Sequence, residues 1–233
     1  MAPGNSSHTF EEVSRQPGQG LERPAPVVIT PLCDADVNEA ARLCFEVFLY
    51  DEPTTRRIAP DPVRVFPESA WYVQSLVGRG LSFVARNKRT HEITGFTFCF
   101  DLTDDFSPDH ERFTAFFDNF RPAIAMIDEL EARYLDRSWC TPGFVLHAYQ
   151  GGVRKEYRRS GVLTSLVYRT IAAARERGFH KIIADCTSPA SQQALERCGF
   201  RQAGFLGYDA FFIDGVRYFE GLYGGLSLMV KDL

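Results

Sequence analysis

VRKEYRRSGVLTSL, residues 153–166, is the most informative segment of this sequence. It closes a strand-like run, passes through a short basic loop, and after Gly161 continues with apolar residues at helical spacing. The first amides of a helix lack intrahelical partners and lie at the positive end of its dipole, so they suit a phosphate. Gly161 lets the backbone approach an anion closely, and Arg158 and Arg159 add charged donors. The stretch therefore predicts a phosphate-binding loop, although an ordinary strand-to-helix connection with exposed arginines would fit the same residues.

Strands and helices alternate on both sides of this loop. β-Branched and alternating runs predict strands at 27–29, 81–86, 93–100, 144–153 and 181–184, and around 200–212 and 216–230. Helical spacing predicts helices at about 37–50, 68–76, 113–135, 162–177 and 189–198, with 54–66 irregular. This order predicts one mixed α/β domain over 26–233 with a helical insert at about 102–140. The proline-rich residues 1–25 are expected to form a mobile tail.

Composition excludes several classes of protein. A chain of 233 residues, 45% hydrophobic, is long enough for one sizeable core. Its net charge of −4 and the lack of a long Lys/Arg block argue against nucleic acid as a partner. No apolar run approaches the ~20 residues of a membrane span. We expect a cytoplasmic protein, a monomer or homodimer, whose partner is a small molecule.

The six cysteines form neither a CxxC pair nor a compact framework, which favours reduced and mostly buried thiols. The five histidines do not fall at ligand spacings beside those cysteines, so no metal is expected. Cys186 and Cys198 are interpreted as core thiols.

The strand–RxxGx–helix unit, a following strand, a helix ending in ERCGF and a final hairpin together resemble the GNAT acetyltransferase superfamily. The resemblance implies the acyl-CoA N-acyltransferase fold: α/β, with a mixed central sheet of about seven strands, splayed strands four and five, and helices on both faces. In that family the pattern R/Q-x-x-G-x-G/A binds the pyrophosphate of acetyl-CoA. Here it reads Arg158, Gly161 and Leu163, and the leucine departs from the usual small residue.

The same resemblance places acetyl-CoA, the cosubstrate, along the strand and loop just described. It implies a bulge at Gly151-Gly152-Val153, where the amide of Val153 would stabilise the oxyanion. The implied cofactor-binding residues are Gly152, Val153, Arg158, Arg159, Ser160, Gly161, Val162, Leu163 and Thr164.

Four stretches also resemble the insect-type arylalkylamine (dopamine) N-acetyltransferases. They are Asp51-Glu52-Pro53, AIAMIDELEARYLD (123–136), DCTSPASQQALERCGF (185–200) and GGLSLMVKDL (224–233). This resemblance implies catalytic roles for Glu52, as general base, and for Thr187 and Ser191 near the start of a helix. A base is needed because only the neutral form of an amine is nucleophilic. Ser191 would assist the departing thiolate at the positive end of a helix dipole.

Structural interpretations of the same residues stay open. Glu52 also fits a solvated position before a turn, Thr187 a backbone contact at the helix start, and Ser191 an ordinary first-turn serine. His147, on a predicted strand, is an alternative base or a structural histidine. The acidic run at 101–111 fits either a solvated loop or an amine-attracting surface. The aromatic residues of the insert fit either an aryl slot or core; they are Phe106, Phe113, Phe116, Phe117, Phe120 and Tyr134.

The expected function is therefore transfer of acetyl from acetyl-CoA to the primary amine of a small molecule, by direct attack in a ternary complex. An arylalkylamine such as dopamine, serotonin, tyramine or histamine is the expected acceptor. Two alternatives remain: acetylation of another amine (polyamine, amino acid or antibiotic), and a non-catalytic acyl-CoA-binding domain.

Overall fold

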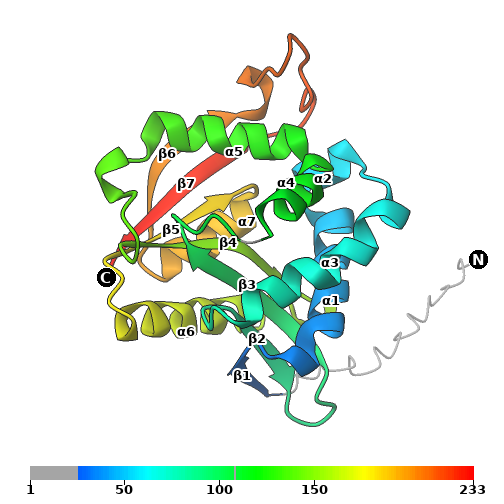
Figure 1. Ribbon diagram of the computed structural model, residues 1–233, viewed down its shortest axis with the longest axis vertical. Helices are drawn as coiled ribbons and strands as arrows, with labels where there is room; N and C mark the ends of the chain where they lie inside the picture. The colour runs from blue at the N-terminus through cyan, green and yellow to red at the C-terminus, as the bar shows by residue number, and fades with distance from the viewer. Residues whose placement is uncertain (1–25, 108) are drawn as a thin grey trace, which may run out of the picture.

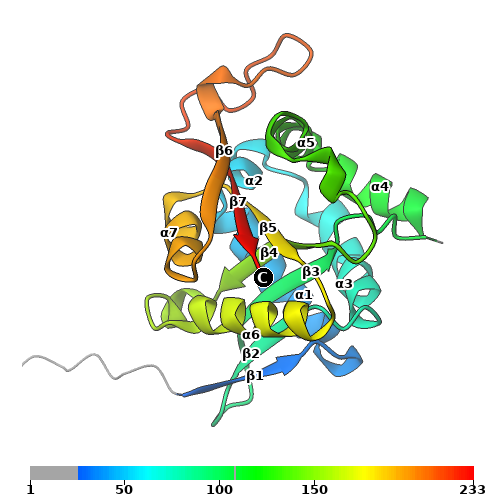
Figure 2. The ribbon, with the colours of Figure 1, turned by 90° about the vertical axis from the view of Figure 1, so that its left-hand side faces the viewer.

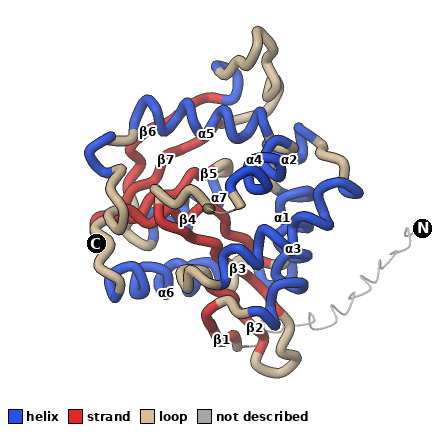
Figure 3. Tube along the Cα trace, viewed as in Figure 1, coloured by secondary structure: helices blue, strands red, loops and turns tan. Residues whose placement is uncertain are grey.

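The computed structural model describes residues 26–107 and 109–233, so the expected mobile tail at 1–25 lies outside the described residues. Seven strands form one sheet in the order β1-β2-β3-β4-β5-β7-β6 (Figure 3). The strands are β1 Val27–Pro31, β2 Phe83–Asn87, β3 Ile93–Asp101, β4 Val145–Val153, β5 Lys181–Cys186, β6 Arg201–Gly207 and β7 Gly225–Asp232. The predicted mixed seven-stranded sheet is confirmed.

β4 and β5 form the one parallel pair of this sheet, and they pair only at their first residues. The register runs from Val145 opposite Lys181 to His147 opposite Ile183 and then stops. β4 nevertheless continues to Val153 and β5 to Cys186. The two strands therefore part after three residue pairs, as expected for splayed strands four and five.

Helices cover both faces of the sheet (Figures 1 and 2). α6 and α7 pack on one face, and α1, α3 and α5 lie on the other. The helices are α1 Val37–Asp51, α2 Pro53–Ile58, α3 Pro62–Val77, α4 His110–Asp118, α5 Arg121–Tyr134, α6 Val162–Glu176 and α7 Pro189–Arg197. None of these described helices has the length and apolar character that a bilayer crossing requires.

The expectation that 54–66 is irregular was wrong. α2 ends at Ile58 and α3 begins at Pro62, six residues before the predicted start, so the two helices together occupy most of this segment. Each helix opens with a capping carboxylate followed by proline: Glu52 accepts from two amides of α2, and Asp61 accepts from the Val63 amide of α3. These cap-plus-proline signals outweigh the weak apolar periodicity.

Three further expectations need correction. The predicted helix at 113–135 is two helices, with Pro122 in the first turn of the second. Residues 208–224 do not continue the last two strands; beyond a short 3-10 turn, they hold one isolated bridge, Ile213 to Val216, on a segment that projects past α5 (Figure 1). The bulge of β4 falls at Tyr149 and not at the glycine pair, since Phe98 and Cys99 face Gln150 and Ala148.

Candidate active site

The N-terminus of α6 is free of any side-chain cap. Gly161 is its N-cap residue, with φ at +84°, and no side chain among residues 26–107 and 109–233 caps the first-turn amides. A Cβ on Gly161 would find no heavy atom within 4 Å, so the space around this residue is open. Arg159 also has a positive φ, +61°, which turns the loop sharply before the helix. Uncapped amides at an open helix end form a site for an anion.

The part of β4 beyond its pairing with β5 exposes alternate backbone groups. The Arg154 amide donates to the Thr94 carbonyl of β3 at 2.8 Å. Hydrogen-bonded residues alternate along an antiparallel pair, so Gly152 faces β3 and the Val153 amide points away from it. That direction leads to the side from which β5 has parted. The Val153 carbonyl, on the same side, accepts from Arg158 Nε at 3.1 Å.

Packing accounts for the second of the two glycines of β4. A Cβ on Gly152 would lie 2.7 Å from the Phe96 ring and 2.9 Å from Val47, so only glycine fits. A Cβ on Gly151 would stand 3.6 Å from Leu163, which is an ordinary van der Waals contact. Leu163 therefore lies next to this part of β4 without requiring glycine at 151.

Charged and polar side chains of the loop have local partners. Arg158 Nη2 pairs with Asp51 Oδ2, at the end of α1, at 2.5 Å. The Ser160 hydroxyl donates to the Tyr157 carbonyl and does not line the cavity described next. The Arg158–Asp51 pair is partly exposed, so it bridges α1 and the loop at a solvent-accessible position.

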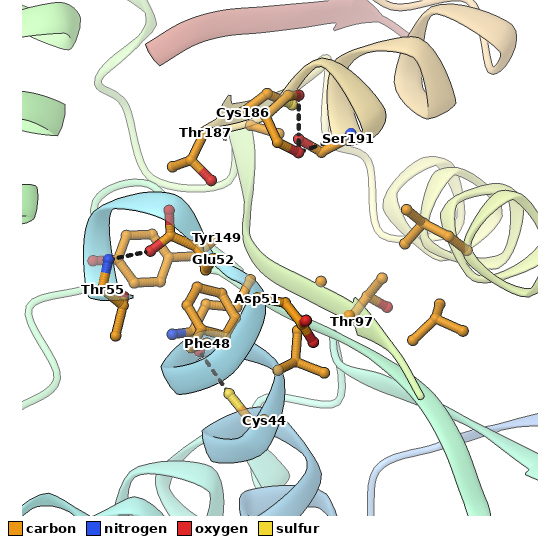
Figure 4. Close-up of a pocket in the computed structure, with 18 of the residues that line it drawn as sticks. Cys44, Phe48, Asp51, Glu52, Thr55, Thr97, Tyr149, Cys186, Thr187 and Ser191 are labelled. Atoms are coloured by element: carbon orange, nitrogen blue, oxygen red, sulfur yellow. Dashed lines mark hydrogen bonds between the residues drawn. The ribbon is translucent and has the colours of Figure 1, made fainter. Parts of the chain in front are cut away.

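One cavity of about 910 Å³ joins the loop to the centre of the molecule (Figure 4). It is lined by the loop and α6, by β4 from Ala148 to Val153, by α7, and by α1 to α5 on the far side. Of the predicted cofactor-binding residues it includes Gly152, Val153, Arg158, Arg159, Gly161, Val162, Leu163 and Thr164, and omits Ser160. All three predicted catalytic residues line it as well.

Glu52 is both a helix cap and a wall of this cavity. Its Oε1 accepts from the Thr54 amide at 2.9 Å, and its Oε2 accepts from the Thr54 hydroxyl at 2.8 Å and the Thr55 amide at 2.6 Å. The side chain is therefore held in one orientation beside Tyr149 (Figure 4). A carboxylate offers about four acceptor positions, so one remains on Oε1. Glu52 is not a solvated residue, because its exposed fraction is 9%.

Thr187 and Ser191 occupy different environments on the opposite wall. The backbone carbonyl of Thr187 accepts a hydrogen bond from the Tyr208 hydroxyl at 2.6 Å. The side chain of Thr187 points into the cavity, toward the side where Glu52 lies (Figure 4). The Ser191 hydroxyl donates to the Ser188 carbonyl at 2.8 Å within the first turn of α7. Burial, with Glu52 nearby, raises the pKa of Tyr208, so the phenol keeps its proton.

The side of the cavity formed by α3, α4 and α5 is largely apolar. α3, α4 and α5 contribute only uncharged residues to the lining: Val65, Ser69, Tyr72, Val73, Phe116, Phe117, Ala123, Ile124 and Ile127. Of the six aromatic residues singled out in the sequence, Phe116, Phe117 and Phe120 line the cavity. Phe106 and Phe113 stack on each other within the core, and Tyr134 is 42% exposed. None of the acidic residues at 101–111 lines the cavity; Asp104, for example, forms a partly buried ion pair with Arg79, which follows α3.

His147 lies behind the cavity wall. Its side chain is buried and its Nε2 is 2.8 Å from Asp185 Oδ2 and 3.8 Å from Glu131 Oε1. Of these three residues only Asp185 is part of the lining. Burial raises the pKa of Glu131 to about 7. His147, the alternative base, is thus separated from the cavity by the carboxylate of Asp185.

Sequence reasoning missed several lining residues. Asp51 was seen only as part of a helix end, whereas the ion pair with Arg158 places it at the cavity. Tyr149 and Asp185 come from β4 and β5 at the point where these strands part, which strand periodicity does not reveal. Cys186 and Cys198 are buried, as predicted, and burial raises the pKa of Cys186 to about 12.

Solved structures of similar fold include several acetyltransferases. Arylalkylamine N-acetyltransferase 2 from Aedes aegypti has a TM-score of 0.69 at 17% identity, over 88% of this chain and 98% of that one. The polyamine N-acetyltransferase of Drosophila melanogaster that forms N-acetylagmatine has a TM-score of 0.69 at 17% identity, over 89% and 100%. A phosphinothricin acetyltransferase from Sinorhizobium meliloti, in complex with acetyl-CoA, has a TM-score of 0.59 at 15% identity, over 89% and 88%.

At these identities the likeness establishes a shared fold. No curated protein sequence matches the chain. A sequence profile of the acetyltransferase (GNAT) family, however, matches residues 36–200. Since that match spans well over half of the chain, this protein belongs to the acetyltransferase (GNAT) family.

Proposed function

We propose that the protein transfers acetyl from acetyl-CoA to the primary amine of a small arylalkylamine. The observation that carries this proposal is one cavity with two unlike ends. One end offers uncapped helix amides and two arginines to a diphosphate, and the other is an uncharged chamber of aliphatic and aromatic side chains. The parted strands β4 and β5 lie between them.

The diphosphate of acetyl-CoA would bind at Gly161, with Arg158 and Arg159 as charged partners. The pantetheine arm would then run along the unpaired part of β4. The Val153 amide, directed away from β3, would donate to the acetyl oxygen as negative charge develops on it. Leu163 lines the same cavity next to this part of β4.

Acetyl transfer then follows by direct attack. The neutral amine nitrogen forms a bond to the acetyl carbon, and the carbon–sulfur bond breaks. The amine proton passes to the remaining acceptor position on Glu52, directly or through a water. The leaving thiolate receives a hydrogen bond from the α7 side, where Thr187 and Ser191 line the cavity. Both reactants are bound together, so no covalent enzyme intermediate is needed.

The charge distribution favours a monoamine with an aromatic tail over a polyamine. The lining carboxylates are Asp51 and Glu52 at the end of α1 and Asp185 on β5. The lining contributed by α3, α4 and α5 contains no carboxylate to hold a second cationic group. Burying an unpaired ammonium against aromatic rings alone is costly, whereas an aryl ring gains from the same contacts.

An amine panel tests this function. Acetyl-CoA is mixed with tyramine, dopamine, serotonin, histamine, spermidine and agmatine, and free thiol is measured. We expect turnover with the arylalkylamines and little with the polyamines. Exclusive turnover of spermidine or agmatine would refute the acceptor assignment, and CoA binding without turnover of any amine would indicate a binding domain.

A matched pair of variants tests the role of Glu52. Glu52→Gln keeps a cap acceptor but cannot take a proton, and Asp61→Asn makes the same change at the cap of the next helix, outside the cavity lining. We expect Glu52→Gln to lose at least ~100-fold in kcat and Asp61→Asn to keep the wild-type rate. Equal rates in the two variants would mean that Glu52 acts only as the N-cap of α2 and not as the base.

A further inference from the structure

A buried group of two carboxyls and one imidazole lies where β4 and β5 stop pairing. Glu131 comes from α5, His147 is the last residue of β4 paired with β5, and Asp185 stands two residues beyond the end of that pairing. Their side chains are 20%, 5% and 2% exposed. One ligand atom from each lies within 4.8 Å of the other two.

Two oxygens of this group have no hydrogen-bond donor among the described residues. Asp185 Oδ2 contacts His147, but the buried Oδ1 of the same carboxyl has no partner, and neither does Glu131 Oε1. In the described part of the chain no lysine or arginine pairs with either carboxyl. A buried carboxylate oxygen without a donor is costly, so the native protein must supply a proton or a cation here.

The distances suit a metal ion. Ligand atoms about 2.0–2.1 Å from a tetrahedral zinc ion stand about 3.3 Å from each other. His147 Nε2 lies 2.8 Å from Asp185 Oδ2 and 3.8 Å from Glu131 Oε1, so the two separations bracket that value. One imidazole with two carboxylates is a ligand set for a divalent first-row transition metal. The third separation, between the carboxyl oxygens of Glu131 and Asp185, is also within 4.8 Å.

We propose that Glu131, His147 and Asp185 bind a divalent transition-metal ion, with zinc as the probe. The ion fastens α5 to β4 and β5 at the point where the strands part. It therefore stiffens the cavity wall that carries Asp185, and it does so whether or not the acceptor is an arylalkylamine. The absence of histidine–cysteine spacing did not exclude this site, because its ligands come from three separate elements.

Zinc titration of chelator-stripped protein tests the proposal. The readouts are calorimetric binding of zinc chloride and the thermal unfolding midpoint with and without zinc. We expect one zinc ion per chain with a Kd of about 1 µM or below, and a rise in Tm of about 5 °C at 100-fold excess over Kd. Stripped protein that binds no zinc, or whose Tm does not rise, would overturn the proposal and assign a shared proton to the two carboxyls.

Two conservative variants and one matched control locate the ion. Glu131→Gln and Asp185→Asn each remove one charged ligand without a large change in volume. Glu129→Gln changes the same residue type on the same helix, but at a side chain that pairs with Arg133 on the surface. We expect the first two to weaken zinc binding at least tenfold and to lose the Tm rise, and Glu129→Gln to behave as wild type.

Equal zinc responses in all three variants would overturn the assignment. X-ray data collected at the zinc absorption edge give a second readout that does not depend on stability. The expected anomalous peak lies between Glu131, His147 and Asp185. A peak at the exposed thiols Cys33 or Cys140 and none at the cluster would refute the site.

Discussion

Two glycines at opposite ends of α6 allow a controlled test of the proposed anion site. Gly161 precedes the helix with φ at +84°, and Gly178 follows it with φ at +79°. At both positions an added Cβ meets no heavy atom within 4 Å. Alanine would therefore impose the same left-handed backbone strain at each site, about 1–2 kcal/mol, and lower Tm by roughly 2–8 °C.

Coenzyme A binding should separate the two variants. Gly161 adjoins the uncapped amides of α6 and Gly178 lies at the opposite end, so only Gly161→Ala adds a methyl group at the end that carries those amides. Losing one charge-assisted hydrogen bond costs about 1.5–3 kcal/mol, or roughly 10–150-fold in Kd. Calorimetric titration with coenzyme A should show that loss in Gly161→Ala and wild-type affinity in Gly178→Ala. Equal affinities in the two variants would refute a diphosphate site at the start of α6.

Three further variants probe the cavity and the fold. Asp51→Asn frees Arg158 from its ion pair, so coenzyme A should bind roughly two- to fivefold more tightly in calorimetry; unchanged or weaker binding contradicts this. Ser191→Ala should lower kcat more than it weakens coenzyme A binding, and an unchanged kcat would leave the hydroxyl a helix-turn role. The hydrogen bond from Arg79 lowers the pKa of Asp104, so its ionised form stabilises the fold above pH ~4, and this contribution is lost as pH falls through the lower folded pKa. Asp104→Asn should thus be less stable than wild type at pH 7, with a difference in unfolding free energy that shrinks by pH 2.5; a difference that grows would contradict the pairing.

Local signals in the sequence were enough to predict the strand–loop–helix unit around Gly161 and most of the sheet. A glycine at 161 suits the positive φ of the loop, and the apolar spacing that follows it is typical of a helix. Both signals depend on only a few neighbouring residues. The short helix after Glu52 was missed because it buries little and depends on its cap. The predicted strand at 200–212 was too long, because the residues after Gly207, although typical of strands, do not pair within the described sheet.

The chemistry of the site was harder to predict, because it depends on contacts between distant elements. The Glu52 carboxylate is oriented by the next two residues, which a sequence reading can anticipate. The position of Glu52 opposite Thr187 depends on how α1 packs against β4, which the periodicity of the sequence does not reveal. The meeting of Glu131, His147 and Asp185 likewise requires the exact register of β4 with β5 and the placement of α5.

The most direct test is a crystal structure of the protein soaked with coenzyme A. The proposal predicts the diphosphate on the amides that follow Gly161, and the thiol in the space between β4 and β5, on the side of Glu52 and Thr187. Coenzyme A bound elsewhere, or a thiol pointing out of the cavity, would contradict the proposal.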